Sequence, residues 1–508
     1  MQRMAHGVNS SDRASEISTA LTTEPEVPTV PFSFMFPALS DDANKLLTPS
    51  EKTLGDLADL GATMEDKDDN TDFDSTIPAA YTYFAQFVDH DIAFTDVHKK
   101  EGQTDSELLN DKNLSPWSKT DIADKVRNKR IVPLGLECVY GNLTNRQLPP
   151  RDGEKFALGR VCPHHNRIIY KDEDNDLVRT GHSPDFKKDR AALINDPRND
   201  SNLIVSQFHV AFLRAHNEIV DKLKCTFEDA RLILLKHYQW MIYHDLLPRF
   251  VRKEEIEAAR YDPFEEPPAG VPLEFSIAAY RFGHSMIRRS YYLNDSFPRI
   301  SLNRLFMLTV LSNGLTATPG EGCLNLPGNK IIQWRKFFEG GRNKARQIRP
   351  QMVEPLFTLR DEASQHVKGE KRLAVQDLKR GYMMRIPTGQ ALAGRIGIKK
   401  EEELTADDFQ KYAVNSKQFD VLKTSEFLTK TPLWFYVLTE AAKQYHVTRK
   451  DQLGPVGGRI VAEAIVEFIR RTPDSFLNNG WTPSDLCFKP GKFLITDLLR
   501  RAGVLENP

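Results

Sequence analysis

Residues 80–96 have the sequence Ala80-Tyr-Thr-Tyr-Phe-Ala-Gln-Phe-Val-Asp-His-Asp-Ile-Ala-Phe-Thr-Asp96. The stretch contains no Gly and no Pro, and its apolar side chains recur with the period of an α-helix. On such a helix Gln86, Asp89 and His90 lie on one side, one turn apart, whereas Asp91 points away. Polar groups within a mostly apolar helix need partners, and buried ionisable groups often carry function. For a histidine taken alone, a hydrogen-bonded place in the core is the simpler explanation.

The composition is that of a large folded protein. The chain has 508 residues, 40% of them hydrophobic, and a net charge of −1, so nothing points to nucleic acid or an anionic membrane as a partner. Five scattered cysteines without a CxxC pattern favour a reducing compartment over a disulfide framework. No signal peptide and no membrane-spanning stretch are recognisable. These features predict a cytoplasmic protein, and they leave export by a non-classical route open.

The pattern along the chain predicts a mobile tail at residues 1–30 and one large, mainly α-helical domain at 31–508 with minimal β structure. The apolar segment 31–37 is expected to pack on the core. Three long helices are predicted, over residues 203–224, 227–252 and 275–289. Further helices are expected after a turn within 380–393, after Thr431 with Pro432 near its start, and after the glycine-rich turn at 454–458, whose glycines indicate tight helix packing.

Three further motifs contain polar residues in otherwise apolar surroundings. They are Asp196-Pro-Arg198, Phe212-Leu-Arg214-Ala-His216-Asn217 and Arg281-Phe-Gly-His284. Each alone is explained by a surface ion pair or a core histidine. Together with Gln86-x-x-Asp89-His90-Asp91, in this order and spacing, they resemble the haem peroxidases of the peroxidase–cyclooxygenase superfamily. The resemblance covers about residues 75–470. The opening segment, the Leu378-Lys-Arg380 element and the turn at 454–463 are most similar to the bacterial branch.

The resemblance implies a large helical domain around a buried haem b. His284 resembles the proximal ligand of the haem iron, whose other ring nitrogen needs a hydrogen-bond partner. Counted from Arg380 and Pro387, Gln390 occupies the position of that partner. Arg281, one turn before His284, is expected to meet a haem propionate.

On the other side of the haem, the resemblance implies that His90 is the distal acid–base residue and Arg198 the distal cation. Gln86 is expected to hold water or a halide, or to orient peroxide. The implied activity is that of a peroxidase: hydrogen peroxide is cleaved heterolytically at iron to a ferryl intermediate. That intermediate then oxidises a small organic donor or a halide.

Some positions depart from the family's pattern. Asp89 matches a carboxylate that forms an ester with the haem, but the second ester position is Ser201, with Asp200 beside it, so the haem has at most one ester link. Asp91 matches a calcium ligand. Glu137 is the remaining carboxylate in the segment expected to complete that site, which makes Asp91 and Glu137 the candidate calcium ligands.

Two alternatives remain. A haem fatty-acid dioxygenase of the same superfamily carries a tyrosine three residues before the proximal histidine. Arg281 occupies that position here, and Tyr280 is one residue away, so the peroxidase interpretation is favoured. The second alternative is a haem-binding protein with reduced activity.

Overall fold

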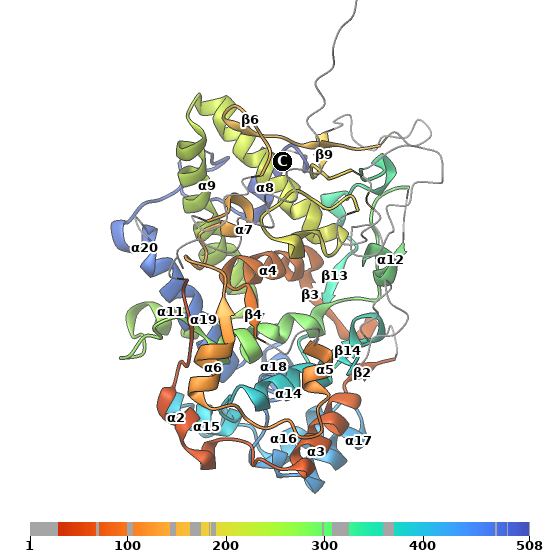
Figure 1. Ribbon diagram of the computed structural model, residues 1–508, viewed down its shortest axis with the longest axis vertical. Coiled ribbons are helices and arrows are strands. Elements are labelled where there is room, and N and C mark those ends of the chain that lie inside the picture. Colours follow the sequence, from red (N-terminus) through yellow and green to blue (C-terminus); the bar gives the residue numbers. More distant parts are fainter. Residues whose placement is uncertain are drawn as a thin grey trace, which may run out of the picture.

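Helix α4 (Ala79–Ile92) lies in the middle of the computed structural model, between α8 (Leu203–Leu223) on one side and α14 (Leu373–Met383) and α18 (Leu433–Thr448) on the other (Figure 1). Twelve of its fourteen residues are buried, and Gln86 and Asp89 are the two that are partly exposed. The helix predicted around His90 is confirmed. Its two partly exposed residues are those predicted to share the side of His90.

The structure describes residues 29–506, except 68–70, 99–104, 143–148, 163–173, 182, 184–188, 297–298, 307–324, 359–369, 473–474 and 485. The predicted mobile tail falls almost wholly outside these residues. Among the described residues, 54% are helical and 10% lie in strands, which confirms a mainly α-helical fold. Within the described ranges, no helix combines the length and the apolarity needed to cross a bilayer.

Further helices surround the central ones. The other α-helices are α2 (Pro37–Asp41), α3 (Glu51–Ala62), α5 (Asp105–Leu109), α6 (Lys119–Lys125), α7 (Glu137–Tyr140), α9 (Phe227–Met241), α10 (Leu247–Phe250), α11 (Lys253–Tyr261), α12 (Leu302–Phe306), α13 (Glu354–Phe357), α15 (Gly389–Ile396), α16 (Ala406–Tyr412), α17 (Ser416–Thr424), α19 (Pro455–Arg471), α20 (Phe476–Asn479) and α21 (Ile495–Arg501).

The β structure consists of two-stranded ladders. The parallel pairs are β1 (Phe32–Ser33) with β10 (Val271–Pro272) and β2 (Glu65–Asp66) with β14 (Met352–Val353). The antiparallel pairs are β3 (Asp74–Pro78) with β13 (Lys344–Arg346), β4 (Thr95–Val97) with β5 (Val126–Asn128), β6 (Arg151–Asp152) with β7 (Lys155–Phe156), β8 (Gly159–Arg160) with β9 (Asp174–Asp176), and β11 (Ser290–Tyr291) with β12 (Ile300–Ser301).

The segment 31–37 packs on the core as predicted. Strand β1 pairs with β10, and the backbone N–H groups of Met35 and Phe36 donate to the buried carboxylate of Glu274 at 2.8 and 3.2 Å. These contacts join the start of the described chain to the segment that leads into the helix carrying His284.

Two predicted helices are less regular than expected. The segment 227–252 consists of α9, the π-helical turn η4 (Ile242–Leu246) and α10, because Pro248 lacks the N–H that would continue the α-helical ladder. The segment 275–289 consists of the π-helical turn η5 (Glu274–Ala278) and the 3₁₀-helix η6 (Ala279–Met286). A 3₁₀-helix has three residues per turn, so residues three apart lie on the same face. Arg281 and His284 therefore share a face of η6.

The C-terminal helices follow the prediction, with one shift. Arg380 lies within α14 rather than in a turn, and the chain turns at Arg385, which has a φ of 55°. Helices α18 and α19 pack tightly: a Cβ atom on Gly457 would lie 2.7 Å from Cγ1 of Val437. The predicted role of the glycines at 454–458 is confirmed at Gly457.

The prediction that the cysteines stay reduced is wrong for Cys162, which is disulfide-bonded. Its partner lies outside the described residues. Cys138, Cys225 and Cys487 are free. No CxxC pattern marks this bond in the sequence, and the inference of a reducing compartment loses its basis.

Candidate active site

His90 lies near the C-terminal end of α4, and its side chain is buried, with 6% of the residue exposed. Its Nδ1 atom lies 2.8 Å from Oδ1 of Asn199, in the 3₁₀ turn η3 (Pro197–Asp200). Burial, together with the nearby charge of Arg198, lowers the pKa of His90 to about 4, so the ring is neutral at pH 7. Nε2 makes no hydrogen bond to any residue that the structure describes, which leaves it available as a proton acceptor.

Arg198 closes the C-terminal end of α4. Its Nη2 donates to the backbone carbonyls of His90 and Ala93 at 3.0 and 2.8 Å, and the guanidinium also pairs with Asp196. Burial alone would raise the pKa of Asp196, but its hydrogen bonds to Arg198 and the surrounding positive charge hold it at about 2. The side chain of Arg198 remains 31% exposed. The structure thus brings the predicted distal cation next to the predicted distal histidine.

Arg130 completes this arrangement and was not predicted. Its Nε and Nη2 atoms both donate to the carbonyl of His90, and its guanidinium pairs with Asp196. Two guanidinium groups therefore share one buried carboxylate beneath the end of α4. The sequence signal for Arg130 is weak, because it lies at the end of a charged connection.

The side chain of Gln86 has one hydrogen-bond partner among the described residues, whereas the side chain of Asp89 has none. Oε1 of Gln86 accepts a hydrogen bond from Nδ2 of Asn202 at 3.3 Å, and Asn202 also caps the N-terminus of α8. Nε2 of Gln86 has no bonding partner among the described residues. The carboxylate of Asp89 makes no hydrogen bond or ion pair within the same set. Both side chains are free to meet a bound group.

His284 is held from one side and open on the other. Its Nδ1 atom lies 2.8 Å from Oδ2 of Asp377 in α14, and its side chain is 30% exposed. Nε2 has no hydrogen-bond partner in the described part of the chain. Beside it, a Cβ atom on Gly283 would meet no atom within 4 Å. The predicted ligand nitrogen is therefore uncommitted among the described residues, and the backbone next to it at Gly283 is open.

Asp377 is a site residue that the sequence did not predict. The side chain is fully buried, and its Oδ1 atom accepts from Arg281 at 2.5 Å and from Arg380 at 3.4 Å. Burial would raise the pKa of Asp377, but the charges of Arg281, His284 and Arg380 lower it to about 2. The available signal was the i, i+3 spacing of Asp377 and Arg380 on an apolar helix.

The prediction that Gln390 orients His284 is wrong. The Nε2 atom of Gln390 donates to Oγ1 of Thr431 at 2.7 Å and to the carbonyl of Leu428, and its Oε1 accepts from the N–H of Thr431. The chain turns at Arg385 between α14 and α15, so Gln390 joins α15 to the start of α18 instead. Counting along the chain did not reveal this turn.

Two of the three nitrogen atoms of the Arg281 guanidinium have partners in the protein. Its Nη1 atom pairs with Asp377, and its Nε donates to the carbonyl of Ser276 at 3.1 Å. Nη2 has no partner among the described residues, and the side chain is 23% exposed. One edge of the guanidinium thus remains for an acidic group such as a propionate.

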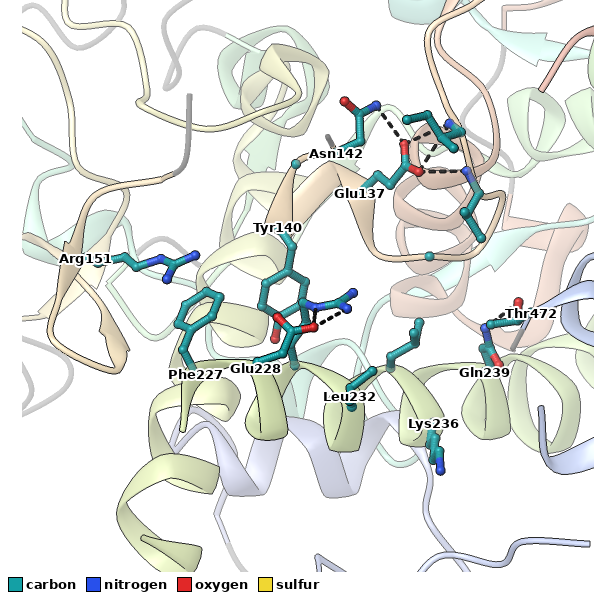
Figure 2. A pocket seen from close by; sticks show the side chains of 16 residues that line it. Glu137, Tyr140, Asn142, Arg151, Phe227, Glu228, Leu232, Lys236, Gln239 and Thr472 are labelled. Carbon is teal, nitrogen blue, oxygen red and sulfur yellow. Dashed lines mark hydrogen bonds and ion pairs between the residues drawn. The ribbon is translucent and has the colours of Figure 1, made fainter. Parts of the chain in front are cut away.

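The two predicted calcium ligands accept N–H groups from neighbouring residues. Both carboxylate oxygens of Asp91 accept backbone N–H groups, from Leu136 at 2.9 Å and from Cys138 at 3.1 Å. Glu137 accepts the N–H groups of Ile131 and Val132 and the amide of Asn142, as Figure 2 shows. An N–H donor aimed at a carboxylate oxygen competes with a cation for the lone pairs of that oxygen. No cluster of three metal-ligating side chains occurs in the ranges described above.

No carboxylate at positions 200 and 201 is available for the second haem ester. Ser201 cannot form that ester, and Asp200 is buried in an ion pair with Arg179, with Nη1–Oδ2 and Nη2–Oδ1 distances of 2.7 and 3.1 Å. Asp200 is therefore not a substitute for it. The expectation of at most one ester link rests on Asp89.

A cavity of about 570 Å³ lies between α7 and α9, away from these residues. Figure 2 shows Tyr140, Phe227 and Leu232 along it, with charged side chains at its edges. None of His90, Arg198 and His284 lines it. The chemistry points to His284 and the open backbone at Gly283 instead, because Nε2 of His284 has no partner among the described residues.

The residues around His284 fit a haem. An imidazole with one nitrogen held by a carboxylate and the other free is the donor that haem iron requires. The open space at Gly283 allows a planar group to approach the backbone. Nη2 of Arg281 and the carboxylate of Asp89 are uncommitted polar groups, among the described residues, of the kind that meet the edge of such a group.

Comparisons with known proteins agree with this assignment. A family model described as animal haem peroxidase matches residues 136–313, a range that contains Arg198 and His284. A peroxidase-like protein of Margaritifera margaritifera is 24% identical over 315 residues, which are 50% of this chain and 37% of that protein. A dual oxidase of Drosophila melanogaster is 30% identical over 116 residues, 21% of this chain and 7% of that protein. The chain thus matches less than half the length of either relative.

The solved structure of peroxidase A from Dictyostelium discoideum is similar over 94% of this chain and 93% of that chain. Its TM-score is 0.53 at 14% identity, so the similarity shows the fold alone. Residues 136–313 thus match the animal haem peroxidase family, and the described chain shares its helical fold with a solved peroxidase.

Proposed function

We propose that the protein is a haem-dependent peroxidase, in which His284 binds the iron and His90 transfers the proton of hydrogen peroxide. One observation carries the proposal. Two histidines lie on elements that pack against each other, α4 and η6, and each has one ring nitrogen held and the other uncommitted among the described residues. Neither of these nitrogens is a buried atom without a partner, so each is accessible to a bound group.

The haem, when bound, supplies the redox chemistry that breaks the O–O bond. His284 would hold it through Nε2, while Asp377 fixes the ring through Nδ1. Arg281 would meet a propionate through Nη2, and Asp89 would lie at the haem edge, where a single ester bond is chemically accessible. The proposal for the haem is therefore haem b with one ester link at most.

His90 performs the proton transfer in this proposal. Its neutral ring accepts a proton at Nε2 from one peroxide oxygen and returns it to the other, which leaves as water. Arg198 supplies a permanent positive charge beside the ring, which stabilises negative charge on the departing oxygen. Gln86 offers its Nε2 donor to peroxide or to a halide.

The oxidised substrate is proposed as a small organic donor or a halide. A dioxygenase is less well supported, because Tyr280 is buried and its hydroxyl donates to the carbonyl of Ala85 at 3.4 Å. That hydroxyl joins η6 to α4, and Arg281 occupies the face that η6 shares with His284. Within the superfamily, a relation to the bacterial branch is part of the proposal.

The test is an absorption spectrum of the purified protein, followed by turnover of peroxide with a phenol, bromide and iodide in parallel. A Soret band and donor oxidation are expected. His284→Ala should lose the Soret band, whereas His446→Ala, which changes an exposed histidine, should keep it. A protein that binds no haem after reconstitution would contradict the proposal. Haem binding without turnover of any donor would favour the haem-binding alternative.

A further inference from the structure

A second buried histidine, His209, is linked to His90 through the side chain of Asn199. Nδ1 of His90 lies 2.8 Å from Oδ1 of Asn199, and Nδ2 of the same Asn199 side chain lies 3.1 Å from Nδ1 of His209. Asn199 and His209 have no exposed surface, and His209 lies in α8, which packs against α4. The three side chains therefore form a continuous hydrogen-bonded chain that ends in the core.

The direction of each hydrogen bond follows from the chemistry of the amide. An asparagine amide has a nitrogen that only donates and an oxygen that only accepts. Nδ2 of Asn199 donates to Nδ1 of His209, so Nδ1 of His209 carries no hydrogen. Oδ1 of Asn199 faces His90, so Nδ1 of His90 carries the hydrogen and donates it. In a neutral ring this leaves the lone pair of His90 on Nε2.

A histidine at position 209 is costly for stability. Its Nε2 atom is buried and has no hydrogen-bond partner among the residues that the structure describes. A purely structural position at the same depth is better filled by an apolar side chain, since an unsatisfied buried polar atom is destabilising. Burial also lowers the pKa of His209 to about 4, so the ring stays neutral and Nδ1 remains an acceptor.

We infer that His209 is a positioning residue which, through Asn199, holds His90 in the tautomer that presents an unprotonated Nε2. This inference rests on the proposed function, in which Nε2 of His90 accepts the peroxide proton. A free imidazole favours the opposite tautomer, with hydrogen on Nε2, which could not accept that proton. Without His209 the amide of Asn199 has no acceptor to define its orientation, and both its rotamers become available.

The test compares three variants. His209→Leu removes the acceptor. His209→Asn keeps an oxygen near the position of Nδ1, so it should restore the hydrogen bond that Leu abolishes. His216→Leu is the matched control: His216 is also a buried histidine of α8, but it bonds Tyr140 and the carbonyl of Glu154 rather than Asn199.

The first readout is the tautomer itself. ¹⁵N NMR of histidine-labelled full-length protein, in the diamagnetic ferrous carbon monoxide complex, distinguishes a protonated from an unprotonated Nδ1 of His90. Wild type, His209→Asn and His216→Leu are expected to show hydrogen on Nδ1. His209→Leu is expected to shift His90 toward hydrogen on Nε2. The second readout is the association rate of hydrogen cyanide with the ferric protein, which needs a base at His90 and should fall on the order of tenfold in His209→Leu alone.

Each outcome decides the inference. Hydrogen on Nε2 of wild-type His90 overturns it, and this result does not depend on any variant folding. An unchanged tautomer and cyanide rate in His209→Leu also overturns it, as does a His209→Asn variant that behaves like His209→Leu. If the protein binds no haem, the proposed function fails separately, and the NMR spectrum of the haem-free chain still reports the tautomer.

Discussion

Nδ1 of His284 and Oδ2 of Asp377 lie 2.8 Å apart, although 93 positions separate the two residues in the chain. The contact joins η6 to α14 and places a fully buried carboxylate directly behind the proposed iron ligand. Arg281, three residues before His284, binds the other oxygen of the same carboxylate because η6 is a 3₁₀-helix. One side chain thus fixes both the imidazole and the neighbouring guanidinium.

Asp377→Asn is expected to weaken haem binding about 10- to 100-fold, since an amide is a poorer acceptor for the imidazole N–H than a carboxylate. The reduction potential of the haem iron should also rise, because a negative charge near the ligand is lost. Haem transfer to apomyoglobin and spectroelectrochemical titration measure the two effects. Asp408→Asn, which removes a carboxylate in α16 that pairs with Lys443, is the control. Unchanged affinity and potential in Asp377→Asn would argue against a direct role for this carboxylate.

His90→Leu is expected to slow the reaction with peroxide by about 10²- to 10⁴-fold while the Soret band is retained. The reason is that Leu preserves the buried volume but offers no proton acceptor. Stopped-flow absorption with excess peroxide gives the rate, and His446→Leu serves as the exposed control. A variant that reacts as fast as the wild type would remove His90 from the mechanism.

Arg198→Ala is expected to lower both the peroxide rate and the stability. It leaves the carbonyls of His90 and Ala93 without this donor and removes one of the two cations that flank the buried Asp196, at a cost of about 2–4 kcal/mol. Urea unfolding measures the loss. The control is Arg385→Ala, which removes an arginine that donates to the carbonyl of Ser40, and which should leave the peroxide rate unchanged. Equal peroxide rates in Arg198→Ala and wild type would contradict a catalytic role for Arg198.

Calcium chelation is expected to change neither the Soret spectrum nor the melting temperature, because Asp91 and Glu137 already accept backbone N–H groups. Asp91→Asn should destabilise the protein by about 1–3 kcal/mol, since its amide nitrogen would face an N–H donor. Asp96→Asn, which changes an exposed carboxylate in β4, should have little effect. A melting temperature that rises by several degrees with added calcium would show that a cation site exists after all.

Stability should depend on pH through the buried histidines. Burial lowers the pKa values of His90, His209 and His216 from 6.5 to about 4. At a pH between about 4 and 6.5, these histidines bind protons in the unfolded chain but not in the folded protein. Stability is therefore lost as the pH falls through this window, by on the order of 3 kcal/mol for each histidine.

The buried acids Glu440 and Glu463 change the pH dependence of stability in the opposite direction. Burial raises their pKa values to about 7, so their contribution is lost as the pH rises from 4.5 toward 7. The informative measurement is thus the difference in unfolding free energy between wild type and His216→Leu across pH 4–7. This difference should shift in favour of the variant as the pH falls. A difference that does not vary with pH would show that folding does not lower the pKa of His216.

The sequence by itself determined the central helix, the mainly helical fold and the choice of His90, Arg198 and His284 as candidate site residues. These features depend on local information: apolar spacing along α4, a proline–arginine turn before α8, and short motifs in a set order. Local spacing decides which side chains share a face of a helix, so the period of the α-helix alone was enough to group Gln86, Asp89 and His90.

Only the tertiary structure decided which groups meet across the fold. It placed Asp377 rather than Gln390 against His284, turned Asp91 and Glu137 toward backbone N–H groups rather than a cation, and linked His90 to His209. Each of these contacts joins elements that are separated in the sequence by turns such as the one at Arg385, whose direction no periodic pattern encodes. A hydrogen bond requires two atoms within about 3 Å of each other, and that proximity is set by how the helices pack rather than by the residues of either helix alone.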